Sequence, residues 1–181
     1  GAGFRAEGIP KRVPIDVCPV LTPRLQAAPE FAAKFGIFFG ACDVSIIAAE
    51  NGLDIAIKAT RKLADQAVAQ FDGLMRAQTI MRIAVNGETR AQLTPPLVKM
   101  TKAMVPIPVG GFLQATQKGE DALAELLLSH AKKSKSIADL FCGSGPFTFA
   151  FAQNHPVHAV ASEQPAISAL HSDVRNQNGL T

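Results

Sequence analysis

The chain has 181 residues, of which 48% are hydrophobic and 18% charged, and its formal net charge is +3. This composition excludes a disordered or collagen-like chain, and the apolar runs are too short to cross a bilayer. The three cysteines lie far apart and make no disulfide framework, and no secretory signal is visible. We therefore expect a globular, cytoplasmic protein without membrane contact.

The first part of the chain predicts irregular structure followed by helix. Residues 1–20 mix Gly, Pro and short Val/Ile stretches, which indicates extended or looping chain. Thr22 before Pro23 is typical of a helix start, because proline fits the first helical position. Pro29 predicts a second helical segment, which we expect to end at Gly36.

Two segments carry the signature of β-hairpins. Residues 42–59 and 79–93 each consist of two strand-like runs around an Asn-Gly pair, Asn51-Gly52 in the first and Asn86-Gly87 in the second. Both residue types tolerate positive φ, as a two-residue hairpin turn requires. Between the hairpins, apolar residues at helical spacing predict an amphipathic helix over 62–76.

The pattern changes near residue 110. A short strand-like piece over 110–116 leads to a helix predicted over 117–131, with Thr116 as its N-cap. We expect three leucines to lie on the buried face of this helix: Leu123, Leu126 and Leu127.

Strands and helices alternate after this helix, which indicates a parallel sheet. The predicted elements are a strand over Ile137–Phe141, a helix from about Pro146 to Gln153, a strand over Val157–Ala161 and a helix over about 165–176. The fold class is therefore α/β. We predict a mixed α+β domain over residues 1–108 and a second, α/β domain over residues 109–181.

The most informative segment is 138–147, where a turn with Gly143 and Gly145 joins a strand to a helix. Glycine lets a backbone approach a ligand closely, and the free N–H groups at a helix start suit an electron-rich ligand group. Asp139 precedes the turn, and Glu163 stands just past the second strand. A carboxylate there can accept hydrogen bonds from the two ribose hydroxyls of a nucleoside cofactor.

The class of cofactor follows from what the turn lacks. The third glycine of the dinucleotide fingerprint is absent, since Thr148 stands there. Without a pyrophosphate cradle, a cofactor that lacks phosphates, such as S-adenosylmethionine (SAM), fits better than NAD. The local pattern also leaves open a tight turn with a purely structural role.

These residues resemble a known family. The segments Asp139–Phe147 and Val157–Glu163 are similar to the first cofactor motif and the following strand of the SAM-dependent RNA 5-methyluridine methyltransferases. Three further segments are similar to parts of that family: Phe112–Gln114 ahead of the long helix, Gly3–Leu21 with its Cys-Pro-Val-Leu end, and Asn178–Leu180. The resemblance is strongest over 110–181.

The resemblance implies that residues 109–181 are the first half of a Rossmann-like class I methyltransferase domain. By matching position, Gln114, Phe141 and Glu163 would contact SAM. The family often has Asn or a small residue where this chain has Pro146, so a side-chain contact made there is lost. The expected cofactor-binding residues are Gln114, Asp139, Phe141, Gly143, Gly145 and Glu163.

The resemblance also bears on metal and catalysis. Cys18 would match one iron–sulfur ligand of cluster-bearing members, but the other three ligands have no counterpart in this chain. We expect Cys18 to be a buried free thiol and no iron–sulfur cluster to form. The family's nucleophilic cysteine and carboxylate base would lie beyond Thr181, so we expect no catalytic residue in this chain and no methyl transfer by it alone.

The predicted function is therefore part of an RNA (uracil-5-)-methyltransferase that acts on C5 of uridine, with ribosomal RNA favoured over transfer RNA by the Cys18 segment. Two alternatives are a non-catalytic RNA- or protein-binding module with a vestigial half-Rossmann segment and a SAM enzyme acting on a small molecule. Residues 1–108 carry 13 Lys and Arg against 9 Asp and Glu, which favours RNA. The unfinished sheet leaves an unpaired edge, through which self-association is also expected.

Overall fold

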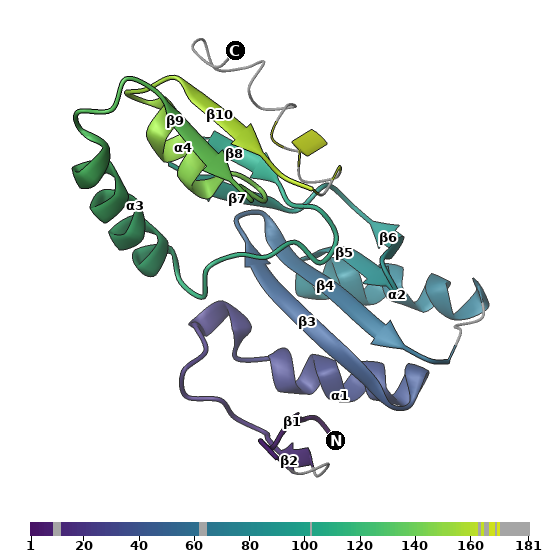
Figure 1. The fold of residues 1–181 in the computed structure, drawn as a ribbon. Helices are drawn as coiled ribbons and strands as arrows, with labels where there is room; N and C mark the ends of the chain where they lie inside the picture. The colour runs from purple at the N-terminus through teal and green to yellow at the C-terminus, as the bar shows by residue number, and fades with distance from the viewer. Residues whose placement is uncertain are drawn as a thin grey trace. The chain divides into compact units, whose positions relative to one another are not determined.

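The computed structural model describes residues 1–8, 12–61, 65–101, 103–162, 164, 167–168 and 170. The chain forms two compact units, Gly1–Pro96 and Leu97–Thr181. Figure 1 shows the elements of both units. The compact units divide before the boundary predicted at residue 108, because an unpredicted hairpin over Leu97–Pro106 belongs to the second unit.

The first unit is built around a four-stranded sheet with the order β3-β4-β5-β6. β3 and β4 are antiparallel, as are β5 and β6, whereas β4 and β5 are parallel because the helix α2 carries the chain across between them. A separate short hairpin pairs β1 with β2. The elements are β1 (Gly3–Arg5), β2 (Arg12–Pro14), the 3-10 helix η1 (Pro23–Leu25), α1 (Ala28–Phe39), β3 (Cys42–Ala49), β4 (Gly52–Ala59), α2 (Asp65–Gln78), β5 (Ile80–Val85) and β6 (Glu88–Gln92).

Both predicted hairpins are present, but they turn for different reasons. Asn86 and Gly87 form the second turn with φ of 52° and 87°, as predicted. In the first hairpin Ala49 pairs with Gly52, so the turn lies one residue earlier than predicted. Gly52 is needed there for space, because a Cβ at this position would lie 2.4 Å from the carbonyl oxygen of Thr79.

Aromatic side chains from the helices and aliphatic side chains from the sheet form the core of the first unit. Phe31, Phe35 and Phe39 recur every four residues on α1 and are buried. The Phe35 ring meets the ring of Phe71 from α2 edge to face, with centroids 6.0 Å apart.

Helix α1 is longer than predicted. It does not end at Gly36 but continues to Phe39, because burying Phe39 extends the apolar stripe by one turn. Gly40 then ends the helix with a positive φ of 72°, which favours glycine, and its N–H donates to the carbonyl of Gly36 at 3.0 Å.

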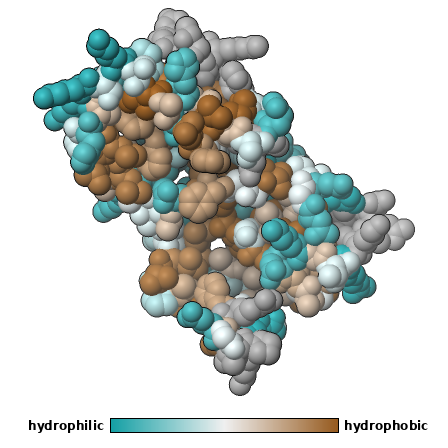
Figure 2. Space-filling view, in the orientation of Figure 1, coloured by the Kyte–Doolittle hydropathy of each residue, from teal (hydrophilic) through white to brown (hydrophobic). Residues whose placement is uncertain are grey.

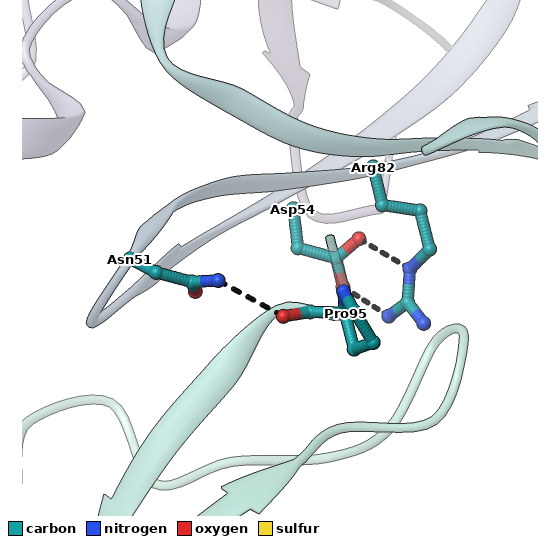
Figure 3. Close-up of polar contacts among 4 residues, drawn as sticks. All are labelled: Asn51, Asp54, Arg82 and Pro95. Atoms are coloured by element: carbon teal, nitrogen blue, oxygen red, sulfur yellow. Dashed lines mark hydrogen bonds and ion pairs between the residues drawn. The ribbon is translucent and has the colours of Figure 1, made fainter. Parts of the chain in front are cut away.

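A buried ion pair occupies the same sheet, as Figure 3 shows. Asp54 on β4 and Arg82 on β5 are 3% and 6% exposed. The Arg82 Nε donates to Oδ1 of Asp54 at 2.8 Å, and Nη2 donates to Oδ2 at 2.6 Å. Nearby, the Asn51 amide donates to the carbonyl of Pro95 at 2.9 Å. Sequence reasoning missed this pair, because charged residues in a strand are usually exposed.

The described part of the second unit includes a short hairpin, helices and a parallel pair of strands. Its elements are β7 (Leu97–Met100), β8 (Ala103–Pro106), α3 (Gln117–Ala131), β9 (Ile137–Leu140), α4 (Pro146–Ala152) and β10 (Val157–Val160). β9 and β10 run parallel, and α4 packs on them, which confirms the predicted strand–helix–strand order. Residues 110–116, predicted to be strand-like, are irregular instead. The helix predicted over 165–176 lies mostly outside the described residues.

Helix α3 begins where predicted, and the Thr116 hydroxyl accepts from the N–H of Gly119 at 3.1 Å. Its predicted buried face is wrong. The leucines at 123, 126 and 127 are 42%, 56% and 38% exposed, whereas Glu120 is buried. In the described part of this unit, α4 is the helix that packs against α3. Most of the surface of α3 is therefore exposed. No helix in the described ranges is long and apolar enough to span a membrane.

Candidate cofactor-binding turn

The turn between β9 and α4 combines three residues with positive φ. β9 ends at Leu140, and Phe141, Gly143 and Gly145 then adopt φ of 62°, 55° and 87°. The N–H of Gly145 donates to the carbonyl of Cys142 at 2.9 Å, which closes the turn. Left-handed residues that alternate with others along a turn are typical of backbone nests, whose N–H groups bind anions.

The two glycines of this turn serve different purposes. A Cβ at Gly145 would lie 2.4 Å from Cδ1 of Leu170, so the packing of Leu170 leaves no room for a side chain at this position. A Cβ at Gly143 would meet no atom of the described residues within 4 Å, so among those residues this side of the turn is open. The N–H groups of Gly143 and Ser144 donate no hydrogen bond to any residue that the structure describes. An open side with available donors fits a polar ligand group.

The parallel strands bring the turn beside the segment that follows β10. The N–H of Cys142 donates to the carbonyl of Val160, the last residue of β10, at 3.1 Å. The carboxyl ends of both strands therefore meet at this edge of the sheet, which is where ligands bind in open α/β sheets. Glu163 comes three positions after Val160 but lies outside the described residues.

Asp139 is held by a partner that sequence reasoning missed. The Thr148 hydroxyl donates to Oδ2 of Asp139 at 2.5 Å, and Thr148 is 1% exposed. Thr148 stands where the dinucleotide fingerprint has its third glycine. The signal was present in the sequence, because a strand carboxylate and a hydroxyl on the first turn of the next helix face each other across a short βα turn. The hydrogen bond fixes the carboxylate at the base of the turn.

Cys142 lies in the turn, but its surroundings make its thiol a poor nucleophile. Burial raises the pKa of its thiol, and the nearby negative charge of Asp139 raises it further. The thiolate is the nucleophilic form of cysteine, and a raised pKa reduces its population near neutral pH. Burial likewise raises the pKa of the Cys42 thiol on β3. Neither environment favours a nucleophile.

The structure therefore gathers four of the six predicted site residues, Asp139, Phe141, Gly143 and Gly145, around one turn. Phe141 is 88% exposed, and its backbone has a positive φ, an uncommon state for an aromatic residue. Gln114 lies half-buried on the irregular segment between β8 and α3. That Gln114 and Glu163 converge on the same ligand stays a prediction.

We also considered a cleft in the first unit, the Cys18 thiol and possible metal-ligand clusters as functional sites. A cleft of about 1120 Å³ in the first unit lies among β1, α1 and β3, with Arg12, Asp43 and Lys58 among its charged lining residues. Cys18 is a free, buried thiol. The described ranges contain no group of three or more His, Cys, Asp or Glu placed to hold a metal ion.

Comparison with known proteins supports the predicted resemblance. No family model matches the chain. It is similar to a protein of Agrobacterium fabrum named as an uncharacterized RNA methyltransferase, with 34% identity over 98% of this chain and 44% of the relative. A 23S rRNA (uracil(1939)-C(5))-methyltransferase of Shewanella sediminis, RlmD, is 22% identical over 84% of the chain and 37% of its own length. The chain thus spans less than half the length of these relatives, and its resemblance to RNA methyltransferases is confirmed.

A solved structure confirms the fold class. The chain superimposes on the Pyrococcus abyssi tRNA (uracil-54, C5)-methyltransferase, determined in complex with S-adenosyl-L-homocysteine, with a TM-score of 0.67. The identity is 16%, and the match covers 93% of this chain and 48% of that one. The mixed α+β architecture followed by a partial Rossmann-like fold is therefore correct.

Proposed function

We propose that this chain carries the cofactor-binding part of a SAM-dependent RNA (uracil-5-)-methyltransferase. The observation that carries this proposal is the β9–α4 turn, with an open side at Gly143, in a chain whose relatives are named as RNA methyltransferases. SAM, when bound, supplies the methyl group.

Five of the six predicted residues have distinct parts in cofactor binding. The N–H groups of Gly143 and Ser144, which donate to none of the described residues, suit the charged amino-acid end of SAM, and Gly143 and Gly145 give the turn its backbone shape. Phe141 offers an exposed ring at the end of β9. Glu163 would bind the ribose hydroxyls, and Gln114 would contact the cofactor from the segment before α3.

The substrate is uridine in RNA, with ribosomal RNA favoured over transfer RNA. Support comes from the Cys18 segment and from the name of the Shewanella relative, a 23S rRNA methyltransferase. The environments of Cys42 and Cys142 support assigning the nucleophile to neither. We assign no catalytic residue, iron–sulfur cluster or metal to this chain.

Two further features complete the proposal. The protein works in the cytoplasm, where RNA substrates are found. The chain also self-associates through the unpaired edge of the β9–β10 sheet, a sheet in which Leu140 and Val160 are 62% and 54% exposed.

Substitution of Gly143 by alanine tests the cofactor site. The new methyl group would enter open space in the free protein, so it would meet the ligand rather than the protein. We expect Gly143→Ala to weaken SAM binding at least about tenfold by isothermal titration calorimetry, a loss of about 1.4 kcal/mol.

Gly110→Ala is the matched control, because Gly110 also has a positive φ, 71°, and open space around its Cβ position. Alanine carries a similar backbone cost at both positions, so both variants should lose similar stability. Equal SAM affinity of the Gly143 variant and the parent chain would remove this turn from the cofactor site.

A further inference from the structure

A cluster of basic side chains lies at the opposite end of the parallel strands from the cofactor turn. It consists of Lys132, Lys133 and Lys135 between α3 and β9, with His158 on β10, and we name it the basic edge. All four side chains are exposed. Figure 2 shows long hydrophilic side chains projecting where α3 gives way to β9, at the upper left.

Backbone hydrogen bonds hold the parts of the basic edge together. The N–H of Ser134 donates to the carbonyl of Ala131 at 2.8 Å, which turns the chain sharply after α3. The N–H of Ile137 donates to the carbonyl of Pro156 at 3.0 Å, so the lysine segment runs beside the start of β10. His158 pairs with Ala138 in the strand register. The lysines are thus presented on a fixed scaffold.

The positive charge of the basic edge is not balanced locally. None of the three lysines forms an ion pair with another residue in the described ranges. The sequence holds no acidic residue over 126–138 or over 140–162. Asp139, between those stretches, accepts a hydrogen bond from the Thr148 hydroxyl on α4. An uncompensated cationic cluster of this kind attracts polyanions.

The spacing between the two ends of the sheet suits a nucleic acid. β9 and β10 are each four residues long, so the basic edge and the cofactor turn are separated by about 13 Å of strand. In duplex DNA each strand carries one phosphate per about 3.4 Å of helix axis, so on that scale this distance corresponds to about four base pairs. One RNA molecule could therefore reach both ends.

We propose that the basic edge binds the phosphate backbone of RNA outside the reacting nucleotide. The inference rests on the proposed function, because the names of the relatives favour RNA over other polyanions. The lysines act as point charges that hold the RNA without reading its sequence. Replacing these lysines should lower the affinity for every RNA sequence to a similar degree.

The test measures RNA affinity against salt concentration for the whole chain. A fluorescently labelled RNA oligonucleotide of about 20 nucleotides is titrated by anisotropy with the parent chain and with a triple variant, Lys132→Gln, Lys133→Gln and Lys135→Gln. Each lost phosphate contact lowers the slope of log K against log salt by about 0.7 to 0.9. We expect the triple variant to lose about two units of slope and about tenfold in affinity at low salt.

A second triple variant is matched in charge. Lys58, Lys99 and Lys118 are exposed lysines elsewhere in the chain, and their replacement by Gln removes the same three charges. We expect this control to retain most of the affinity and slope. Equal losses in both variants would show a response to net charge alone and overturn the inference. SAM affinity and thermal midpoint should be unchanged in the first variant.

The outcomes separate this inference from the proposed function. If the parent chain and the first triple variant bind RNA equally well, the proposed role of the basic edge is wrong, but the proposal of an RNA substrate is retained. If the parent chain binds SAM but no RNA, both the edge and the RNA substrate are refuted. Loss of binding to phosphatidylserine vesicles, with RNA binding unchanged, would also overturn the inference in favour of a lipid surface.

Discussion

Both units contain a parallel pair of strands, and the two pairs have different surroundings. In the first unit β4 and β5 lie inside a four-stranded sheet, with Ile55 and Ile83 fully buried. In the second unit β9 and β10 form a sheet of two strands in which Leu140 and Val160 are more than half exposed. Parallel strands are usually covered on both faces. The first unit therefore buries the apolar side chains of its parallel strands within its own core. The described part of the second unit leaves such side chains exposed, so they can make other contacts.

The largest effect is expected from the core of the first unit. Phe35 is fully buried and packs against Phe71, so Phe35→Ala removes buried apolar area and leaves a cavity. We expect a loss of about 4 kcal/mol in the free energy of unfolding. Urea denaturation followed by circular dichroism gives the loss, and hydrogen exchange of peptides from β4 and β5 assigns it to the first unit.

Leu140→Ala is the corresponding change on the uncovered pair. Because Leu140 is 62% exposed, its truncation should cost less than about 0.5 kcal/mol. Similar losses for the two variants would show that Leu140 is covered in solution, and the contrast between the two pairs would fail.

The second largest effect concerns the buried ion pair of the first sheet. Arg82→Ala would leave the Asp54 carboxylate buried without its two hydrogen bonds. Breaking a buried pair in this way should cost about 3 kcal/mol. The double replacement Asp54→Leu with Arg82→Met should recover most of the loss, since apolar residues of similar volume often substitute for a buried pair.

An exposed pair on α2 serves as the control. Arg76 and Asp72 lie four residues apart, 3.3 Å between Nε and Oδ2, with more than half of each side chain exposed. Arg76→Ala should therefore cost less than about 0.5 kcal/mol. Thermal and urea unfolding of the three variants decide the comparison. A loss at Arg82 no greater than that at Arg76 would mean that the Asp54 site is hydrated.

The sequence predicted local structure best where turn chemistry and periodicity agree. Both hairpins, the helix starting after Thr116 and the strand–helix–strand around Gly143 were predicted within a few residues. Each rests on interactions between residues near in sequence. The β7–β8 hairpin was missed because its turn, at Thr101, carries no Gly or Asn signal.

Long-range packing could not be predicted in the same way. Three leucines at helical spacing on α3 were expected to be buried, but which face of a helix is covered depends on what packs against it. The Asp54–Arg82 pair joins residues 28 positions apart, and no local pattern indicates it. In the site, the turn was predicted from its glycines, whereas the hydrogen bond between Thr148 and Asp139 was missed although the two residues are near in sequence.

The smallest expected effect concerns a buried carboxyl of the second unit. Glu120 on α3 is 9% exposed, and its nearest polar partner is the Gln117 amide at 3.4 Å, a far weaker arrangement than Arg82 gives Asp54. Burial raises the pKa of Glu120 above its ordinary value of 4.5. Ionised Glu120 therefore destabilises the folded chain.

The sign of the pH effect follows from this shift. A carboxyl with a raised folded-state pKa contributes stability that is complete below the unfolded value, near 4.5, and is lost as the pH rises through the folded value. Glutamine keeps the shape and an acceptor for Gln117 but never ionises. We expect Glu120→Gln to raise the thermal midpoint by a few degrees at pH 7 and by less at pH 4. Glu125→Gln, at an exposed position of the same helix, should change neither. A lower midpoint for the Glu120 variant at pH 7 would mean that the carboxylate has a cationic partner in solution, and the two units would then bury charge in the same way.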